Sequence, residues 1–158
     1  MQYRIGSGID SHQLEEGTHL IIGGVSIPSH KGSKGHSDGD VLFHAIVDAI
    51  LGSLSLGDIG KYFPSNSPRW KNADSIIFLE HACKLMGEKG YSVENIDATV
   101  ILQVPVLNPH IEKMRENIAT VLSVNLDQIS VKATTTDKLG FIGRGEGVAA
   151  TASALIKK

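Results

Sequence analysis

Apolar and polar residues alternate along several short stretches of the chain, which is typical of strands that bury one face. The clearest stretch runs from Asn95 to Val104, where every second residue from Ile96 onward is apolar. Two apolar runs meet at Gly23-Gly24, a pair that favours the tight turn of a hairpin. The predicted strands are residues 3–9, the hairpin at residues 20–27, residues 95–104 and residues 129–133.

Other stretches carry apolar residues at the spacing of a helix face. Asp38 or Ser37 is the predicted N-cap of a first helix, which ends near Leu54. A second helix is predicted over residues 73–89, where Leu79, Cys83 and Met86 share one face, and Gly90 is expected to end it. The pair Asn108-Pro109 predicts the start of a third helix, with an Asn cap and a proline in the first turn.

This order of strands and helices predicts an α+β (mixed α/β) fold. We expect a four-stranded mixed sheet and a small hairpin, with helices packed on one face of the sheet. The tail, residues 147–156, fits either a helix or a strand by its pattern. A length of 158 residues suits one hydrophobic core, and no repeat or low-complexity segment divides the chain. Residues 1–158 are therefore expected to form a single domain.

Composition and charge narrow the classes of partner. The 15 Lys and Arg residues nearly balance the 17 Asp and Glu residues, so nothing predicts a nucleic acid or an anionic membrane as partner. The single cysteine, Cys83, excludes an intramolecular disulfide framework and a cysteine-based zinc ribbon. The sequence contains neither a long apolar run nor an N-terminal secretion signal, so we expect a cytoplasmic location.

A candidate metal site begins where the first predicted strand ends. Asp10 and His12 are separated by one residue, so both side chains leave the same face of an extended backbone and can reach one ion. Three protein ligands of nitrogen and oxygen type suit zinc and leave a fourth position open. The plainer interpretation is that Asp10 is a turn residue and His12 an exposed loop histidine.

The third ligand is expected from the first helix or from the loop before it. His36 and His44 are the candidates, and His44 is favoured because Asp40 and Asp48 lie four residues on either side of it. A neighbouring carboxylate can accept the second ring N–H and orient the imidazole. The alternative is a helix-face histidine bonded to Asp40 or Asp48. The remaining histidines, of which His81 is expected to be solvated, are interpreted as structural or surface residues: His19, His30, His81 and His110.

Residues 134–147 predict a phosphate-binding loop. They combine threonine hydroxyls with several glycines, and hydroxyls and freed backbone N–H groups bind phosphate oxygens. Asp137 can hold a hard divalent cation, and Arg144 can form a bidentate pair with a phosphate. The alternative is a Thr-rich strand end followed by a Gly-rich turn. In an earlier loop, Asp58 could bind substrate hydroxyls, although capping of a short helical turn is the favoured interpretation.

Together these segments resemble the 2-C-methyl-D-erythritol 2,4-cyclodiphosphate synthases of the non-mevalonate isoprenoid pathway, over essentially the whole chain. The resemblance implies a phosphorus–oxygen lyase that cyclises 4-diphosphocytidyl-2-C-methyl-D-erythritol 2-phosphate and releases CMP. The segments that carry it are residues 8–12 (GIDSH), 23–28 (GGVSIP), 36–45 (HSDGDVLFHA), 56–64 (LGDIGKYFP), 73–75 (ADS), 131–141 (VKATTTDKLGF) and 144–147 (RGEG).

The resemblance also implies roles for individual residues. The metal ligands would be Asp10, His12 and His44 for zinc, and Asp137 for magnesium or manganese. The catalytic residues would be His36, Thr135 and Asp58. The substrate-binding residues would be Asp10, Ser11, His12, His36, Ser37, Asp58, Ile59, Gly60, Phe63, Pro64, Ser65, Asn66, Ser67, Leu102, Gln103, Val104, Pro105, Val106, Leu107, Asn108, Thr134, Thr135, Thr136, Asp137, Phe141 and Arg144.

The family is a homotrimer with active sites between subunits, so the resemblance implies a small cytidine diphosphate substrate held by two neighbouring chains. Each chain would be a chorismate-mutase-like or ferredoxin-like sandwich in which the tail is a strand. Asp137 stands where the family usually has glutamate, and Val106 where it often has lysine. Ser65, Asn66 and Ser67 replace acidic residues common after Phe-Pro. The alternatives left open are a zinc-dependent phosphohydrolase and a non-catalytic metal- or nucleotide-binding module.

Overall fold

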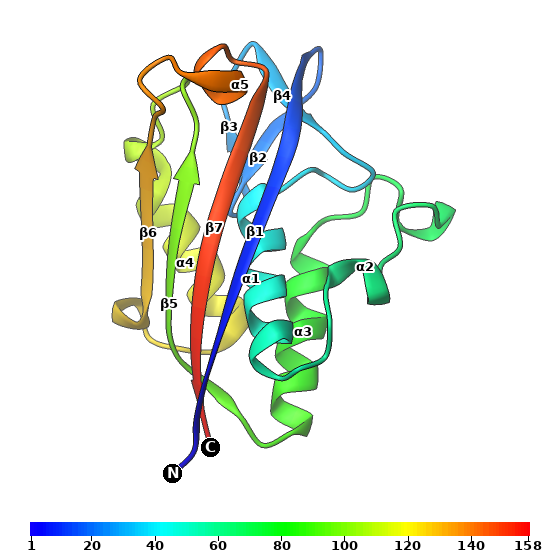
Figure 1. Cartoon of the computed structure of the whole chain (residues 1–158), viewed down its shortest axis with the longest axis vertical. Helices are drawn as coiled ribbons and strands as arrows, with labels where there is room; N and C mark the ends of the chain where they lie inside the picture. The colour runs from blue at the N-terminus through cyan, green and yellow to red at the C-terminus, as the bar shows by residue number, and fades with distance from the viewer.

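A five-stranded mixed sheet, in the order β4-β1-β7-β5-β6, forms the centre of the molecule (Figure 1). The computed structural model describes all 158 residues. Neighbouring strands run antiparallel, except β5 and β6, which run parallel. The strands of the sheet are β1 (Tyr3–Glu16), β4 (Lys31–Lys34), β5 (Ser92–Ile101), β6 (Ile129–Thr134) and β7 (Gly147–Lys157), and β2 (Leu20–Ile22) pairs with β3 (Val25–Ile27) as a separate hairpin.

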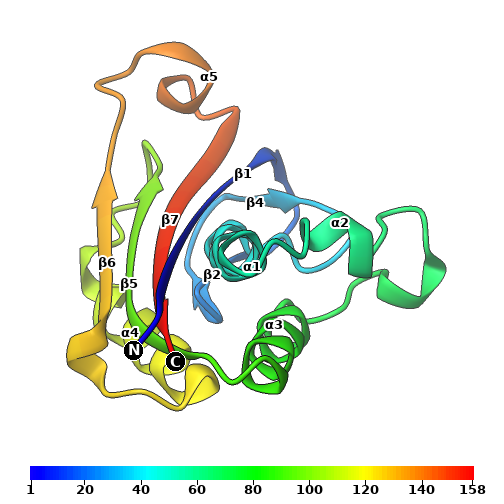
Figure 2. The ribbon, with the colours of Figure 1, turned by 60° about the horizontal axis from the view of Figure 1, so that its bottom comes forward.

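The three long helices lie together behind the sheet in Figure 1, which leaves the other face of the sheet bare. In Figure 2, α1 occupies the middle of this layer, between the sheet, the hairpin and α3. None of the helices is both long enough and apolar enough to cross a membrane. The helices are α1 (Val41–Ser53), α2 (Ile59–Tyr62), α3 (Ile76–Glu88), α4 (Ile111–Leu122) and α5 (Gly140–Gly143), with short 3-10 turns η1 (Pro68–Trp70), η2 (Asn108–His110) and η3 (Leu126–Gln128).

Two glycines in β1 let α1 lie directly on the sheet. A β-carbon at Gly6 would meet the carbonyl oxygen of Ala49 at 1.9 Å, and one at Gly8 would meet that of Ala45 at 2.0 Å. No other residue type fits at such distances without moving the helix. The next residue on the same face of β1 is Asp10, so this close approach brings the carboxylate beside α1.

Asp40, and not Asp38 or Ser37, is the N-cap of α1. Its buried carboxylate accepts the backbone N–H of Phe43 at 3.0 Å, as an N-cap side chain does. The same carboxylate accepts the N–H groups of Gly23 and Gly24, at 2.9 and 2.7 Å. Asp40 therefore fastens the turn of the β2–β3 hairpin to the start of α1.

The predicted elements are confirmed, but Asn108 is not the cap of the third helix: it begins the 3-10 turn η2, and α4 starts at Ile111 with His110 as its N-cap. The sheet needs three corrections. It has five strands instead of four, because the polar segment β4 pairs with the end of β1. Strand β1 continues through Glu16, so Asp10 and His12 lie within a strand and not in a loop. The long elements, with β6, follow one another as β1-α1-α3-β5-α4-β6-β7, which also differs from the βαββαβ order of a ferredoxin-like sandwich. The ambiguous tail is the strand β7.

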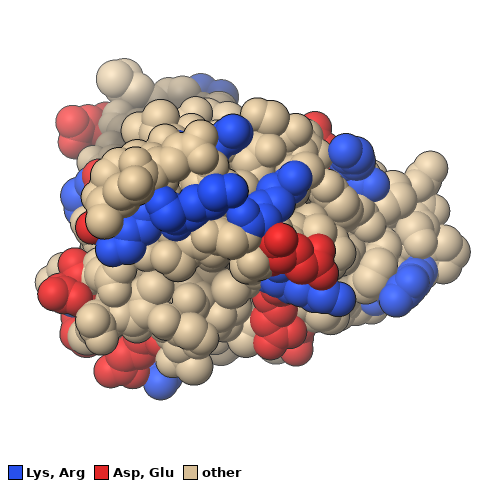
Figure 3. Space-filling view, turned by 90° about the horizontal axis from the view of Figure 1, so that it is seen from below, with Lys and Arg blue, Asp and Glu red and all other residues tan.

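Basic side chains form a row across the end of the molecule where the chain termini lie (Figure 3). Arg4, Lys89 and Lys158 line a shallow hollow there. Both α1 and α3 end at this side: Arg4 donates to the carbonyl oxygen of Ser53 at 3.5 Å, and Lys89 is the C-cap of α3. Cations stabilise the C-terminal ends of helices, so the row has a structural explanation.

Candidate active site

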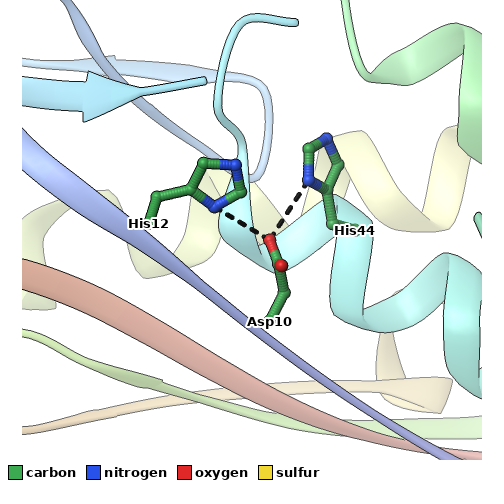
Figure 4. A group of neighbouring side chains, drawn as sticks. All are labelled: Asp10, His12 and His44. Carbon is green, nitrogen blue, oxygen red and sulfur yellow. Dashed lines mark hydrogen bonds and ion pairs between the residues drawn. The ribbon is translucent and has the colours of Figure 1, made fainter. Parts of the chain in front are cut away.

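Asp10, His12 and His44 form a compact cluster between β1 and α1 (Figure 4). Asp10 and His12 leave the same face of β1, and His44 comes from the second turn of the buried helix α1. The carboxylate oxygen Oδ2 of Asp10 lies 2.9 Å from Nδ1 of His12 and 3.1 Å from Nδ1 of His44. The predicted grouping of these three residues is therefore present.

The donor set of this cluster fits zinc. One oxygen and two imidazole nitrogens all lie within 4.8 Å of one another. Two ligands bound about 2.1 Å from a tetrahedral zinc lie about 3.4 Å apart, a few tenths of an ångström more than the 2.9 and 3.1 Å from Asp10 Oδ2 to the two rings. Nδ1 of His12 is buried and has no aligned hydrogen-bond partner, in spite of its 2.9 Å approach to Asp10. An orphaned buried nitrogen that faces a carboxylate is suited to ligate a cation.

Charge interactions within the cluster keep Asp10 ionised. Burial alone would raise the pKa of the Asp10 carboxyl, but the close imidazoles of His12 and His44 lower that pKa to about 2. For His44, burial alone would lower the pKa of the ring, whereas the hydrogen bond and the charge attraction to Asp10 raise it above the ordinary value. In the absence of a metal, the contact with Asp10 therefore favours a proton on His44.

The predicted orientation of His44 by Asp40 or Asp48 is wrong. Asp40 is occupied with the hairpin and the helix cap, and Asp48 accepts the backbone N–H of Ile59 at 2.7 Å. Nε2 of His44 instead lies 2.8 Å from the hydroxyl oxygen of Ser75. A helical spacing of four residues was a weak guide here, because α1 turns both carboxylates toward other elements.

The cluster opens into a cavity of about 310 Å³. Its walls include the strand β1, the loop before α1, the α2 segment and two aromatic residues that the sequence did not single out, Trp70 and Phe78. Phe63 packs between them, with ring centroids 4.9 Å from Trp70 and 4.4 Å from Phe78. The lining residues are Asp10, Ser11, His12, His36, Ser37, His44, Ile59, Gly60, Phe63, Ser65, Trp70 and Phe78.

Other residues predicted for this part of the site lie around the cavity without lining it. Asp58 caps α2 by accepting the N–H of Lys61 at 3.1 Å, so the capping interpretation is confirmed. The carbonyl oxygen of Ser67 lies 2.7 Å from Nε2 of His36 and holds that ring at the cavity edge. Pro64 and Asn66 belong to the same connecting segment and are not among the lining residues.

A second group of predicted residues lies elsewhere on the chain. Residues 102–108 and the end of β6 form a separate cavity of about 170 Å³. It shares no lining residue with the first cavity. The lining residues of the second cavity are Leu102, Gln103, Pro105, Val106, Leu107, Asn108, Ala133, Thr134 and Thr135.

The remaining predicted residues follow β6. Asp137 and Lys138 both have left-handed backbone angles, with φ of 51° and 66°, and the N–H of Asp137 is bonded to the Thr135 hydroxyl at 3.2 Å. Phe141 lines a hollow with Ser11 and His12, on the His12 side of the metal cluster. Thr136 and Arg144 also belong to this group: the Thr136 hydroxyl donates to the Leu139 carbonyl, and Arg144 is paired with Glu146. Arg144 lines a further hollow together with Val104, the one predicted residue of the 102–108 segment that does not line the second cavity.

Sequence reasoning missed several residues near the cavity. Ser75 is completely buried beside His44, and only its place in the motif at residues 73–75 pointed to it. His81, expected to be solvated, instead packs against the rings of Tyr62 and Phe63, with centroids 5.2 Å away in each case. The aromatic spacing of residues 62, 63, 70 and 78 follows neither a helix nor a strand, so no periodic pattern revealed this cluster.

Comparison with known proteins identifies the family. A family model described as the YgbB family matches residues 3–157. The 2-C-methyl-D-erythritol 2,4-cyclodiphosphate synthase of Chlorobium phaeobacteroides is 56% identical over 155 residues, 98% of each chain. The bifunctional IspDF of Campylobacter jejuni aligns with a TM-score of 0.95 and 44% identity over 99% of this chain, which spans 42% of that longer protein. A Plasmodium falciparum IspF complex with CDP aligns with a TM-score of 0.85 and 41% identity, over 98% of this chain and 95% of that one. The chain therefore belongs to the YgbB family.

Proposed function

We propose that this chain is a metal-dependent 2-C-methyl-D-erythritol 2,4-cyclodiphosphate synthase. Its substrate is 4-diphosphocytidyl-2-C-methyl-D-erythritol 2-phosphate. An oxygen of the 2-phosphate forms a bond to the β-phosphorus, the bond from that phosphorus to the bridging oxygen breaks, and CMP leaves with the electron pair. No water is consumed and no protein nucleophile is required, so the chain contributes positioning and charge stabilisation.

The observation that carries this proposal is the cluster of Asp10, His12 and His44 at the wall of a cavity of about 310 Å³. It occurs in a chain that is 56% identical to a protein named as this synthase. Zinc at this cluster and a second divalent cation at Asp137, when bound, would offset the negative charge on the reacting phosphates. Magnesium and manganese both suit the single carboxylate of Asp137.

Other residues around the first cavity would orient the methylerythritol end of the substrate. Asp48 holds the N–H of Ile59, and this bond fixes the backbone of Ile59 and Gly60 at the cavity wall. The cap at Asp58 fixes the same short helix, so its carboxylate is available at a set position for substrate hydroxyls. His36 and Thr135 are the proposed transition-state stabilisers, with Ser37 as a phosphate contact.

The second cavity would hold the cytidine end, but in a neighbouring subunit. Most of residues 102–108, with Thr134 and Thr135, line a cavity that shares no residue with the metal cavity, which supports a site completed by another chain. The bare face of the sheet offers the surface for assembly: Ile5 and Ile9 are 74% and 72% exposed on β1. Large exposed apolar side chains on one sheet face favour burial against another subunit. We propose a homotrimer.

We further propose that residues 1–158 act as one domain, since a single cluster of 36 buried apolar residues joins the sheet, the hairpin and the helices. A cytoplasmic location is proposed on the presence of one free cysteine, Cys83, which has no partner within the chain for a disulfide.

Phosphorus NMR of the enzyme with the cytidyl substrate, zinc and magnesium tests the function. Cyclic diphosphate and CMP in equal amounts are the expected products. Open-chain phosphates would indicate the zinc phosphohydrolase instead. Unchanged substrate whose phosphorus resonances broaden on binding would indicate a non-catalytic module. Either of these results overturns the proposal.

A further inference from the structure

A buried chain of polar groups lies behind the His44 ring, on the side away from Asp10. Nε2 of His44 is 2.8 Å from the hydroxyl oxygen of Ser75, and that hydroxyl in turn donates to Oδ1 of Asp38 in a very short hydrogen bond. Ser75 is fully buried, and His44 is 8% exposed. The three groups come from α1, from the loop before it and from the residue that precedes α3.

Asp38 is held as an acceptor on both of its carboxylate oxygens. Oδ2 accepts the backbone N–H of Ser75 at 2.9 Å, and Oδ1 accepts that of Asp40 at 3.0 Å in addition to the Ser75 hydroxyl. A carboxylate in this arrangement can only accept, so the hydroxyl hydrogen of Ser75 points to Asp38. The oxygen of Ser75 then presents only lone pairs to His44.

This direction bears on which nitrogen of His44 can bind a metal. Ser75 can only accept, so Nε2 donates its hydrogen to Ser75 when a metal occupies Nδ1, and Ser75 thereby favours the ring form whose lone pair lies on Nδ1. Nδ1 is the nitrogen that lies 3.1 Å from the Asp10 carboxylate, within the cluster. Two electron-rich atoms facing each other at that distance require a cation between or beside them.

We propose that Ser75 and Asp38 are positioning residues that lock His44 in its Nε2–H tautomer and so present Nδ1 to the metal. The inference rests on the proposed zinc site but concerns residues that are not ligands. Hydrogen-bond partners of this kind typically contribute about 10- to 100-fold to metal affinity. His12 has no such support, because its side chain makes no hydrogen bond, so the two imidazoles are prepared differently.

Ser37 is the only other side chain within reach of the same nitrogen. Its hydroxyl oxygen lies 3.2 Å from Nε2 of His44 and has no carboxylate behind it. It is also 3.5 Å from the Ser75 hydroxyl, a weak contact at best. Ser75 is therefore the principal partner, and removal of the Ser37 hydroxyl is expected to have the smaller effect on the tautomer.

Two measurements on Ser75→Ala test the proposal. The zinc dissociation constant, from competition with a chelator, should rise about 10- to 100-fold. Long-range proton–nitrogen NMR of metal-free Asp10→Ala, in which no carboxylate competes for the ring hydrogen at Nδ1, should show the Nε2–H tautomer of His44 at a pH that keeps the ring neutral. The tautomers should become mixed when Ser75→Ala is added to this background. The matched control is Ser33→Ala, which removes a buried hydroxyl that has no hydrogen-bond partner and should change neither result.

The outcomes separate this inference from the proposed function. If His44 of metal-free Asp10→Ala shows the Nδ1–H tautomer, or if Ser75→Ala binds zinc as tightly as wild type, the positioning role is wrong even though the metal site stands. If Ser37→Ala weakens zinc binding more than Ser75→Ala, the assignment of Ser75 as principal partner is wrong. If the wild-type protein binds no zinc, the proposed function fails, while the tautomer measurement still tests the hydrogen-bond chain.

Discussion

Gly8 lies so close to α1 that a β-carbon on it would stand 2.0 Å from the carbonyl oxygen of Ala45. The obstacle is helix backbone, which cannot rotate away as a side chain can. Gly8→Ala should therefore push α1 off the sheet and destabilise the fold by about 3 kcal/mol or more. Urea unfolding measures the loss, and zinc affinity should fall with it because His44 moves with the helix.

Gly87 provides the control for this substitution. It lies in α3, and a β-carbon there would have no atom within 4 Å. Gly87→Ala should leave stability unchanged or raise it by up to about 1 kcal/mol, because alanine favours the helix. Equal losses at both positions would show that close approach is not the reason for glycine at position 8.

The low pKa of Asp10 predicts a loss of stability in acid. In the folded, metal-free protein the pKa of Asp10 is about 2, against an ordinary value of 3.8. Below about pH 4 the unfolded chain binds a proton that the folded one does not, so the Asp10 contribution is present above pH 4 and is lost as the pH falls to about 2. The free energy of unfolding of both metal-free proteins, wild type and Asp10→Asn, can be measured across this pH window. It should fall more steeply with decreasing pH for wild type. Parallel curves would contradict the pKa assignment.

His44→Ala should abolish tight zinc binding and turnover, because it removes one of three ligands and leaves Asp10 without a cation on that side. Elemental analysis after dialysis and a product assay measure the two effects. The control is His30→Ala, at an exposed position outside the cluster, which should retain zinc. Normal activity of His44→Ala in metal-free buffer would remove the zinc site from the mechanism.

The two roles considered for Asp58 can be separated by its substitutions. Asparagine caps helices about as well as aspartate, so Asp58→Asn should keep the bond from Lys61 and the melting temperature. If the carboxylate also binds substrate hydroxyls, kcat/KM of Asp58→Asn should fall about 10-fold or more. Asp58→Ala should lower both stability, by about 1 kcal/mol, and activity. An Asn variant with wild-type kcat/KM would leave Asp58 with the cap alone.

The sequence predicted best where local pattern and final contacts agree. The alternation in β5 exposes one face and buries the other, and the apolar run in α1 reflects a helix surrounded by other elements. Strand β4 could not be predicted, because its residues, Lys31–Lys34, show no alternation of apolar and polar side chains. It forms by backbone pairing with the end of β1. A pattern of side chains does not encode backbone pairing of this kind.

The candidate site divides in the same way. The proximity of Asp10 and His12 could be predicted from their spacing, since residues two positions apart in a strand lie on the same face. The partners of His44 could not be predicted, because Asp38 and Ser75 are 37 residues apart and meet only when the start of α3 packs against the loop before α1. The roles of Asp40 and Asp48 were misjudged for the same reason: their partners come from other elements.

The separation of the two cavities predicts that damaged subunits can restore each other's activity. His44→Ala removes a proposed metal ligand, and Thr135→Ala removes a hydroxyl of the cavity proposed for cytidine, so each variant alone should be nearly inactive. If every site joins the metal cluster of one chain to Thr135 of the next, a mixed trimer contains one site in which both parts are intact.

Random mixing by joint refolding gives three quarters mixed trimers, so the mixture should regain about a quarter of the wild-type activity. Native mass spectrometry of size-tagged chains counts the mixed species, and the same assay on each variant refolded alone provides the baseline. Mixed trimers that form but remain inactive would place both parts of the site in one chain. Recovery in monomer fractions would contradict the trimer. Recovery confined to mixed trimers requires a site between subunits, since neither variant carries a complete site within its own chain.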